Sequence, residues 1–175
     1  MSLLGPGFGV VFAQGVATTV VIDSIAANLI EMLAFRFTAL SATPIKKIRV
    51  WVLTKTGTPG NMGAVLTSDA TGIPNVSAEV PVDIGGGSPT LVQITAAEVT
   101  TNAVLTAVFT NAFTPTIGTS YWGVFYPTSG TWDVSNKYTF NTLNNNLGLS
   151  GHFERYATSL DSGATWTHSS GGVIS

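Results

Sequence analysis

The chain has 175 residues, of which only seven are Lys or Arg and nine are Asp or Glu, and its net charge is −2. This length is enough for one domain with a sizeable core, and a weakly acidic chain with so few basic residues argues against electrostatic binding to nucleic acid. No cysteine is present, so disulfides and Cys-based metal sites are excluded. Hydrophobic residues make up 45% and charged residues 9%, so Thr, Ser, Asn and Gly must fill the solvent-facing positions, as they do in a β-rich protein.

Residues 1–22 are apolar and glycine-rich and show no helical period. Two interpretations stay open: a first β-strand, or an extended arm whose apolar groups a neighbouring subunit covers. The first basic residue is Arg36, so we expect no signal peptide. Glycines and a proline between positions 5 and 9 also leave the apolar run too short for a membrane-spanning helix. We therefore treat 1–22 as an arm or first strand and 23–175 as the domain, and we expect a soluble chain with no membrane partner.

Residues 24–33 are the one segment with a plausible helical pattern. Ser24 could cap such a helix, and Ile25, Leu29 and Leu33 recur at helical spacing. The following residues alternate as a strand does, with Phe35 and Phe37 flanking a polar position. We expect a strand over about residues 33–40, with any helix before it short.

Strand patterns dominate the rest of the chain. Residues 45–55 alternate so that Ile48, Val50 and Val52 share one face, whereas Pro81 places residues 76–84 at a sheet edge or in a loop. Further strands are expected at residues 62–69, 91–99, 103–113, 121–127 and 137–143. Short strands separated by turns predict an all-β fold: a single antiparallel β-sandwich, jelly-roll-like, with at most one short helix.

The C-terminal region carries an Asp-box, the Ser-x-Asp-x-Gly-x-Thr-Trp pattern familiar from sialidases, at Ser159, Asp161, Gly163, Thr165 and Trp166. Each member has a structural role in a hairpin. The serine and aspartate accept backbone N–H bonds within the turn, the glycine permits positive φ, and the tryptophan covers an apolar surface. Without a sustained repeat, one such box cannot build a propeller. We therefore predict a structural Asp-box.

Catalytic and metal-binding patterns are not convincing in this chain. Its three arginines, Arg36, Arg49 and Arg155, would have to converge to hold a sialic acid carboxylate, yet two of them lie inside apparent strands. The two histidines, His152 and His168, match no metal-ligand spacing. We predict no enzyme activity, no catalytic residue, no cofactor and no metal.

One loop is a candidate for carbohydrate binding. Trp132 could stack on a sugar while Asp133 and Asn136 form hydrogen bonds to it, with residues 144–148 as a possible companion loop. The structural alternative, which we favour, is that Trp132 covers one end of the sandwich and the polar residues only solvate the loop.

Several short motifs occur in a fixed order along the chain. They lie at Phe35 and Phe37; Lys55, Gly57 and Pro59; Ser68, Asp69, Gly72 and Pro74; Gly118, Thr119, Tyr121 and Trp122; and, last, at the Asp-box. This order resembles that of jelly-roll-like β-sandwich modules of bacteriophage virion proteins and bacterial surface proteins. The resemblance spans about residues 33–168 and leaves residues 1–30 unmatched. It implies a scaffold for assembly or adhesion, with no shared catalytic residues.

Two functions are compatible with these observations. The first is a bacteriophage virion structural protein, either a capsid decoration (cement) protein or a tail or fibre module. Its partners would be other virion proteins and copies of itself, with a trimer as one option, and it would be assembled in the host cytoplasm and then released in the virion. The second is a carbohydrate- or receptor-binding module that mediates adhesion to a host surface.

Overall fold

The computed structural model describes residues 17–22, 25–26, 29–77, 80–85, 90–143 and 155–168. These residues form fifteen strands and no helix, which confirms the predicted all-β class. The strands are β1 (Ala17–Ile22), β2 (Ile25–Ala26), β3 (Leu29–Ile30), β4 (Met32–Thr38), β5 (Ile45–Thr56), β6 (Asn61–Ala70), β7 (Ile73–Pro74), β8 (Val76–Ser77), β9 (Val80–Pro81), β10 (Val92–Ile94), β11 (Ala103–Phe113), β12 (Ser120–Ser129), β13 (Lys137–Leu143), β14 (Arg155–Ser159) and β15 (Thr167–His168).

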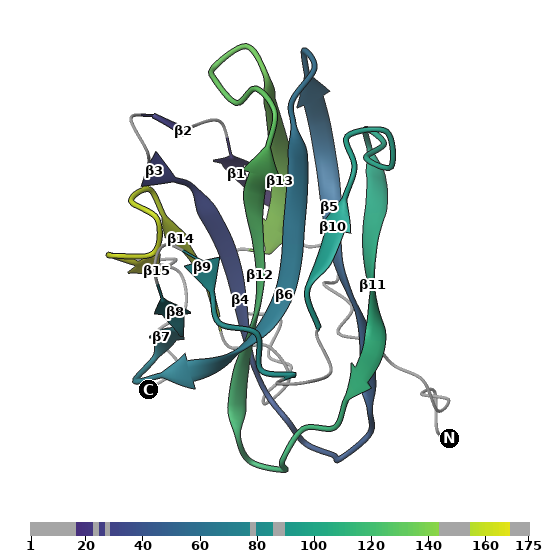
Figure 1. The fold of residues 1–175 in the computed structure, drawn as a ribbon, viewed down its shortest axis with the longest axis vertical. Helices are drawn as coiled ribbons and strands as arrows, with labels where there is room; N and C mark the ends of the chain where they lie inside the picture. Colours follow the sequence, from purple (N-terminus) through teal and green to yellow (C-terminus); the bar gives the residue numbers. More distant parts are fainter. Residues whose placement is uncertain are drawn as a thin grey trace.

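Two antiparallel sheets form the sandwich, and their long strands run along the long axis of the molecule (Figure 1). Sheet 1 has the order β1-β13-β5-β11, and sheet 2 has the order β10-β6-β12-β4-β14-β15, with β7 paired to β6. The hairpin β14–β15 and strand β11 lie at opposite sides of the sandwich (Figure 1). The chain passes repeatedly from one sheet to the other, so the short connections close both ends of the core.

The core between the two sheets is built from alternating inward-facing side chains and is rich in aromatic rings. On β5, Ile48, Val50 and Val52 are buried as predicted. The Phe125 ring of sheet 2 packs across the core on Phe140 of sheet 1, with ring centroids 6.4 Å apart. Such pairs add specific geometry to a large burial of apolar area.

Sheet 2 also has a second, smaller core on its outer face. Trp122, Val124 and Tyr126 of β12 belong to it, and the partly buried Val76 and Trp166 pack against it from above the sheet. This second cover explains why β6 and β12 have nearly continuous runs of buried residues where one-sided strands would alternate. Both faces of β12 are therefore buried over residues 121–127.

The short helix that the sequence left open within residues 24–33 is not formed, because Ile25–Ala26 and Leu29–Ile30 pair as the short strands β2 and β3. One predicted strand differs from the structure in its length. The strand expected at residues 91–99 ends at Ile94, because Glu98 turns the chain: its backbone N–H donates to the Thr95 carbonyl, and its carboxylate accepts from the Thr95 N–H and hydroxyl. This side chain-to-backbone bonding competes with the strand ladder.

Of the predicted N-terminal segment 1–22, residues 17–22 form β1, which pairs with β13 from Ala17↔Leu143 to Ile22↔Tyr138. Residues 1–16 lie outside the described residues, and so do His152 and the loop 144–148.

Candidate functional site

The Asp-box forms the tight turn between β14 and β15. The Ala164 N–H donates to the Asp161 carbonyl (3.2 Å), and the two residues between them, Ser162 and Gly163, have φ of 58° and 83°. Two successive positive φ values are the pattern of a type I′ hairpin turn. Glycine at the second of these positions meets the requirement at little cost.

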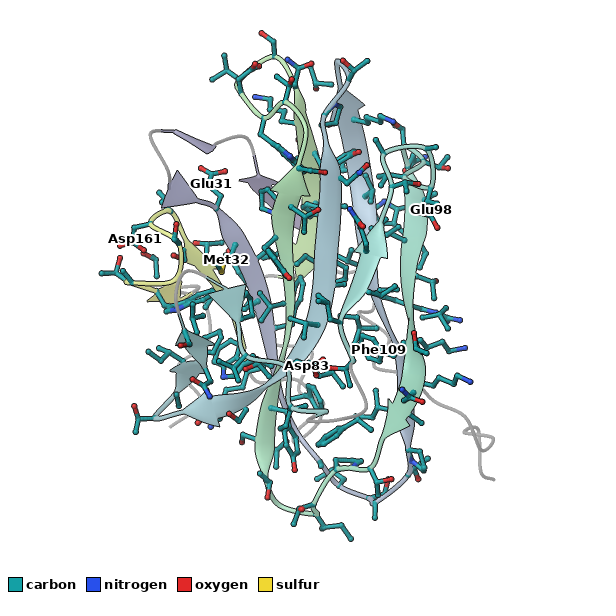
Figure 2. The ribbon with its side chains drawn as sticks, viewed as in Figure 1. Glu31, Met32, Asp83, Glu98, Phe109 and Asp161 are labelled. Carbon is teal, nitrogen blue, oxygen red and sulfur yellow. The ribbon has the colours of Figure 1, made fainter. Side chains whose placement is uncertain are left out.

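The polar side chains of the box are used inside the turn. The Ser159 hydroxyl accepts from the Gly163 N–H (2.7 Å) and donates to Asp161 Oδ1 (2.8 Å). The Asp161 carboxylate then accepts from both the N–H and the hydroxyl of Thr165, at 2.8 and 2.6 Å. These hydrogen bonds, those from Thr165 above all, hold the pKa of Asp161 below its ordinary value. Figure 2 shows Asp161 on this turn at the edge of the molecule.

The box also packs against the outer face of sheet 2. Trp166 donates its indole N–H to the Gly163 carbonyl (3.1 Å) and lies against the second core, while Ser159 is buried. A Cβ atom added at Gly163 would stand 2.8 Å from a methyl group of Val76, so the turn sits directly on strand β8. The five box residues therefore tie the hairpin to the sandwich, and their polar groups bond to one another.

A second polar cluster lies on the same outer face and links three strands. Asp69 Oδ1 accepts from Arg36 Nε (2.9 Å) and from the Trp122 indole N–H (2.7 Å), and Oδ2 accepts from the Gly72 N–H (3.0 Å). Burial by itself would raise the pKa of Asp69, but these hydrogen bonds and the guanidinium charge outweigh it and lower the pKa. The cluster stabilises the β6–β7 turn.

The arginines do not converge on one cleft. Arg36 lies on the outer face of sheet 2, where it binds Asp69. Arg49 lies on β5, and its side chain is on the outer face of sheet 1, away from the core. Arg155 pairs in register with Arg36 through the backbone of β14 and β4. The two sheets thus separate Arg49 from Arg36, so the described arginine side chains do not assemble the triad that sialidase chemistry needs.

The candidate sugar-binding loop closes one end of the sandwich. Trp132 is only 6% exposed; its indole N–H donates to the Ser129 carbonyl (3.1 Å), and its ring packs edge-on against Tyr138 at 5.4 Å. An indole in this position offers no open face for a sugar to stack on. The structure therefore places Trp132 in the covering role that we favoured from sequence.

The two polar residues of the same loop are engaged locally. Asp133 Oδ1 accepts from the Ser135 N–H (2.7 Å) and from the Asn136 amide (3.0 Å), and the Asn136 amide oxygen accepts from the Thr58 N–H (2.9 Å). The hydrogen bonds, first that from Asn136, lower the pKa of Asp133. The loop is fixed to the β5–β6 turn, where Gly57 has φ 62° and comes so close to Ser135 that a Cβ could not fit.

A third cluster was not predicted from sequence. Asp83 accepts from the Gly85 N–H (2.8 Å) and from both the N–H (3.1 Å) and the hydroxyl (2.7 Å) of the buried Thr90, whose hydroxyl oxygen in turn accepts from the Leu66 N–H (3.2 Å). Burial alone would raise the pKa of Asp83, but these bonds lower it. An Asp two residues before a glycine run was the available signal, because Asp side chains accept backbone N–H groups in turns. Its partner Thr90 could not be inferred, since it lies beyond the loop.

The described residues contain no group of three or more His, Asp or Glu side chains that could hold a metal ion. None of the described segments forms a helix of the length and apolarity needed to cross a membrane. Of His168, only the backbone pairing with Ala157 is described.

Comparison with known proteins does not assign the chain to a family: no family model, no curated protein and no solved structure matches it. The structure defines the class, an antiparallel β-sandwich with one structural Asp-box hairpin.

Proposed function

We propose that this protein is a structural subunit of a bacteriophage virion, a capsid decoration protein or a tail or fibre module, and that it acts by assembly with copies of itself and with other virion proteins. One observation carries the proposal: among the described strands, β11 lies at the edge of sheet 1, exposes Val104 and Val108 by about half, and carries no charge. Long apolar edges of this kind are blunted in monomeric proteins and are used where chains assemble.

Two further features support a role in assembly. The absence of charge extends over the whole run from Val99 to Trp132, which includes all of β11 and β12. The polar side chains of the three clusters described above are occupied with turns and loops, so they serve the scaffold. The motif order that resembles phage virion modules points in the same direction.

The proposal predicts that the protein is a component of the particle. Mass spectrometry of gradient-purified particles, from the phage whose genome encodes the chain, should detect it in many copies per particle. The control is a non-structural protein of the same phage, which should be present in the infected lysate and absent from the particles. A chain found in the lysate but not in the particles would overturn the proposal.

A direct binding measurement distinguishes adhesion from assembly. Because Trp132 is buried, we expect the purified protein not to bind a glycan array. Glycan binding that Trp132→Ala abolishes, with the thermal unfolding midpoint unchanged, would support the carbohydrate-binding alternative.

A further inference from the structure

We infer that β11 pairs antiparallel with β11 of a second copy across a two-fold axis at Thr106, joining two copies of sheet 1 into one continuous sheet. This inference rests on the proposed assembly function and names its surface. Within the described strands, β11 pairs only with β5 and is the edge of sheet 1. It spans 11 residues, whereas β10, the neighbouring edge of sheet 2, spans only 3. Short strands protect an edge, and a long, uncharged strand without proline leaves it available for pairing.

The free backbone groups of β11 can be assigned from its pairing with β5. The Asn102 N–H donates to the Leu53 carbonyl (3.2 Å), and the register continues unbroken as far as Val108. Backbone groups of successive residues point to opposite sides of a strand, so Thr106 and the other even-numbered residues bond to β5. Leu105 and Ala107 then direct their N–H and C=O groups toward the free edge.

The strand is complementary to itself. Its sequence from position 103 to 109 is AVLTAVF, with the odd-numbered residues turned toward the core and the even-numbered residues toward solvent. An antiparallel two-fold pairing brings like residues together on the outer face and sets small against large on the inner face, with no like charges opposed. The resulting pairs are Thr106 with Thr106, Val104 with Val108, Leu105 with Ala107, and Ala103 with Phe109.

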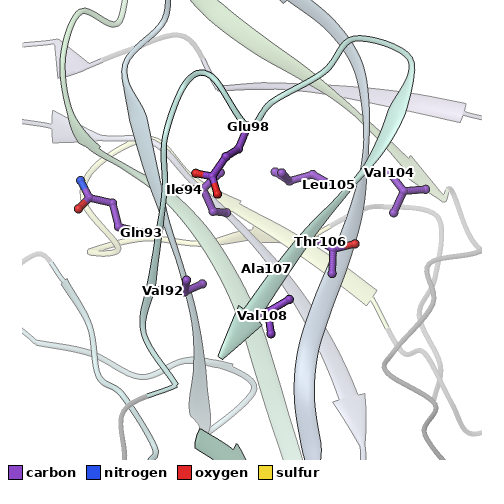
Figure 3. A pocket seen from close by; sticks show the side chains of 9 residues that line it. All are labelled: Val92, Gln93, Ile94, Glu98, Val104, Leu105, Thr106, Ala107 and Val108. Atoms are coloured by element: carbon purple, nitrogen blue, oxygen red, sulfur yellow. The ribbon is translucent and has the colours of Figure 1, made fainter. Parts of the chain in front are cut away.

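A groove beside this edge gives the second copy a surface to cover. It has a volume of about 240 Å³ and lies between β10 and β11, with Val92 and Ile94 on one wall and Val104 and Val108 on the other (Figure 3). The charged side chain that lines it is Glu98, whose carboxylate is bonded to Thr95. The groove mixes polar and apolar surface in about equal parts, as interfaces between proteins also do.

The size of the contact determines how strong the pairing is. Seven paired residues extend over about 24 Å, and a strip of that length buries on the order of a few hundred Å² per copy, less than the roughly 800 Å² per partner of a stable complex. The dimer should therefore be reversible and concentration-dependent in solution. In a particle, other contacts would add to it.

A cysteine scan tests the two-fold axis directly, because the chain has no cysteine of its own. In the proposed dimer, Thr106 and Thr106 of the second copy form a non-hydrogen-bonded pair, whose Cα atoms lie about 4.5 Å apart. This distance is within the range of about 4.4–6.8 Å that disulfides span. Under mild oxidation, full-length Thr106→Cys should form a covalent dimer on a non-reducing gel. Thr110→Cys is the matched control: this residue is also an exposed threonine of β11, but its symmetry mate would lie about 27 Å away.

The two variants have to differ for the inference to stand. We expect at least a tenfold faster cross-linking of Thr106→Cys than of Thr110→Cys at the same protein concentration, with both variants folded by circular dichroism. Equal rates, or a Thr106→Cys variant that stays monomeric at millimolar concentration, would overturn the β11 pairing.

Charge substitutions separate a failure of this inference from a failure of the proposed function. In sedimentation velocity, the double variant Val104→Lys/Val108→Lys should lose self-association. The control variant Val134→Lys, at a 74% exposed valine in the loop between β12 and β13, should associate as the wild type does. If the wild type, the double variant and Val134→Lys associate equally, β11 is not the interface, but the proposed assembly function is not contradicted. A wild-type protein that is monomeric at every concentration would reject β11 pairing, and the particle analysis would then decide the proposed function independently.

Discussion

At the hairpin turn, one hydroxyl group takes part in three hydrogen bonds. Ser159 Oγ accepts from the N–H groups of Asp161 (3.3 Å) and Gly163 (2.7 Å) and donates to the Asp161 carboxylate (2.8 Å). The residue is 1% exposed, so water cannot replace these bonds. The spacing of the box predicted this bonding from sequence, because every partner lies within six residues. The Asp83–Thr90 hydrogen bond was not predicted, because Thr90 is also bonded to Leu66 of β6, which is distant in sequence.

Replacing Ser159 should therefore destabilise the fold. In Ser159→Ala the Gly163 N–H loses its side-chain partner, and we expect a loss of about 1–3 kcal/mol in the free energy of unfolding. Urea denaturation measures this directly. Ser135→Ala, at an exposed loop position, is the control and should change stability by less than about 0.5 kcal/mol. A Ser159→Ala protein as stable as the control would contradict the structural role of the box.

Among the strands, those with one solvent-facing side were the easiest to predict. β5 and β11 alternate between core and solvent, and their predicted limits match the structure within one residue, as do those of β13. The double burial of β6 and β12 was not predictable, because the cover over sheet 2 comes from Val76 and Trp166, far away in sequence. The end of β10 was also missed, because a local turn at Thr95 competes there with a β-like composition.

Two glycines of these central strands should differ in their tolerance of a methyl group. A Cβ at Gly63 would lie 2.6 Å from the buried Tyr126 ring, whereas a Cβ at Gly123 would meet only the two methyl groups of Ile48, at 3.4 and 3.6 Å. We expect Gly63→Ala to cost about 1–3 kcal/mol of unfolding free energy through overpacking. Gly123→Ala should stay within about 1 kcal/mol of wild type. Thermal and urea unfolding of the two variants side by side measures the difference, and equal stabilities would show that the outer core is loosely packed.

The two faces of the molecule differ in how they are covered. Sheet 2 has a core on both sides, whereas the described outer face of sheet 1 presents the exposed Val104 and Val108 beside the basic Lys47 and Arg49. The all-β class and the sandwich could be predicted from the short strands and frequent turns in the sequence. The difference between the two outer faces could not be predicted, because it depends on which sheet the short strands β8 and β9 cover. It is the whole-molecule feature that our assembly proposal uses.

The free energy of unfolding should fall as the solution becomes acidic. Asp69, Asp83 and Asp161 have pKa values below the ordinary 3.8 in the folded chain, so in acid the unfolded chain binds more protons. Their contribution is fully present above about pH 5 and is lost as the pH falls through the folded pKa values. Urea unfolding from pH 7 to pH 2 should show a plateau followed by a decline below about pH 4.

The same series in Asp69→Asn tests the cause. This variant should be less stable at pH 7, because it loses the ionic bond to Arg36, and its decline below about pH 4 should be shallower than that of wild type. An unchanged slope would mean that Asp69 does not contribute to the acid sensitivity.

The position of β1 has a consequence for synthesis of the chain. Ala17 is aligned with Leu143, so β1 cannot find its place in the sheet until 126 further residues have been translated. At about 5–20 residues per second, this takes roughly 6–25 s, during which an apolar segment has emerged from the ribosome without its final neighbour. During that delay the strand is exposed to the non-native contacts that lead to misassembly.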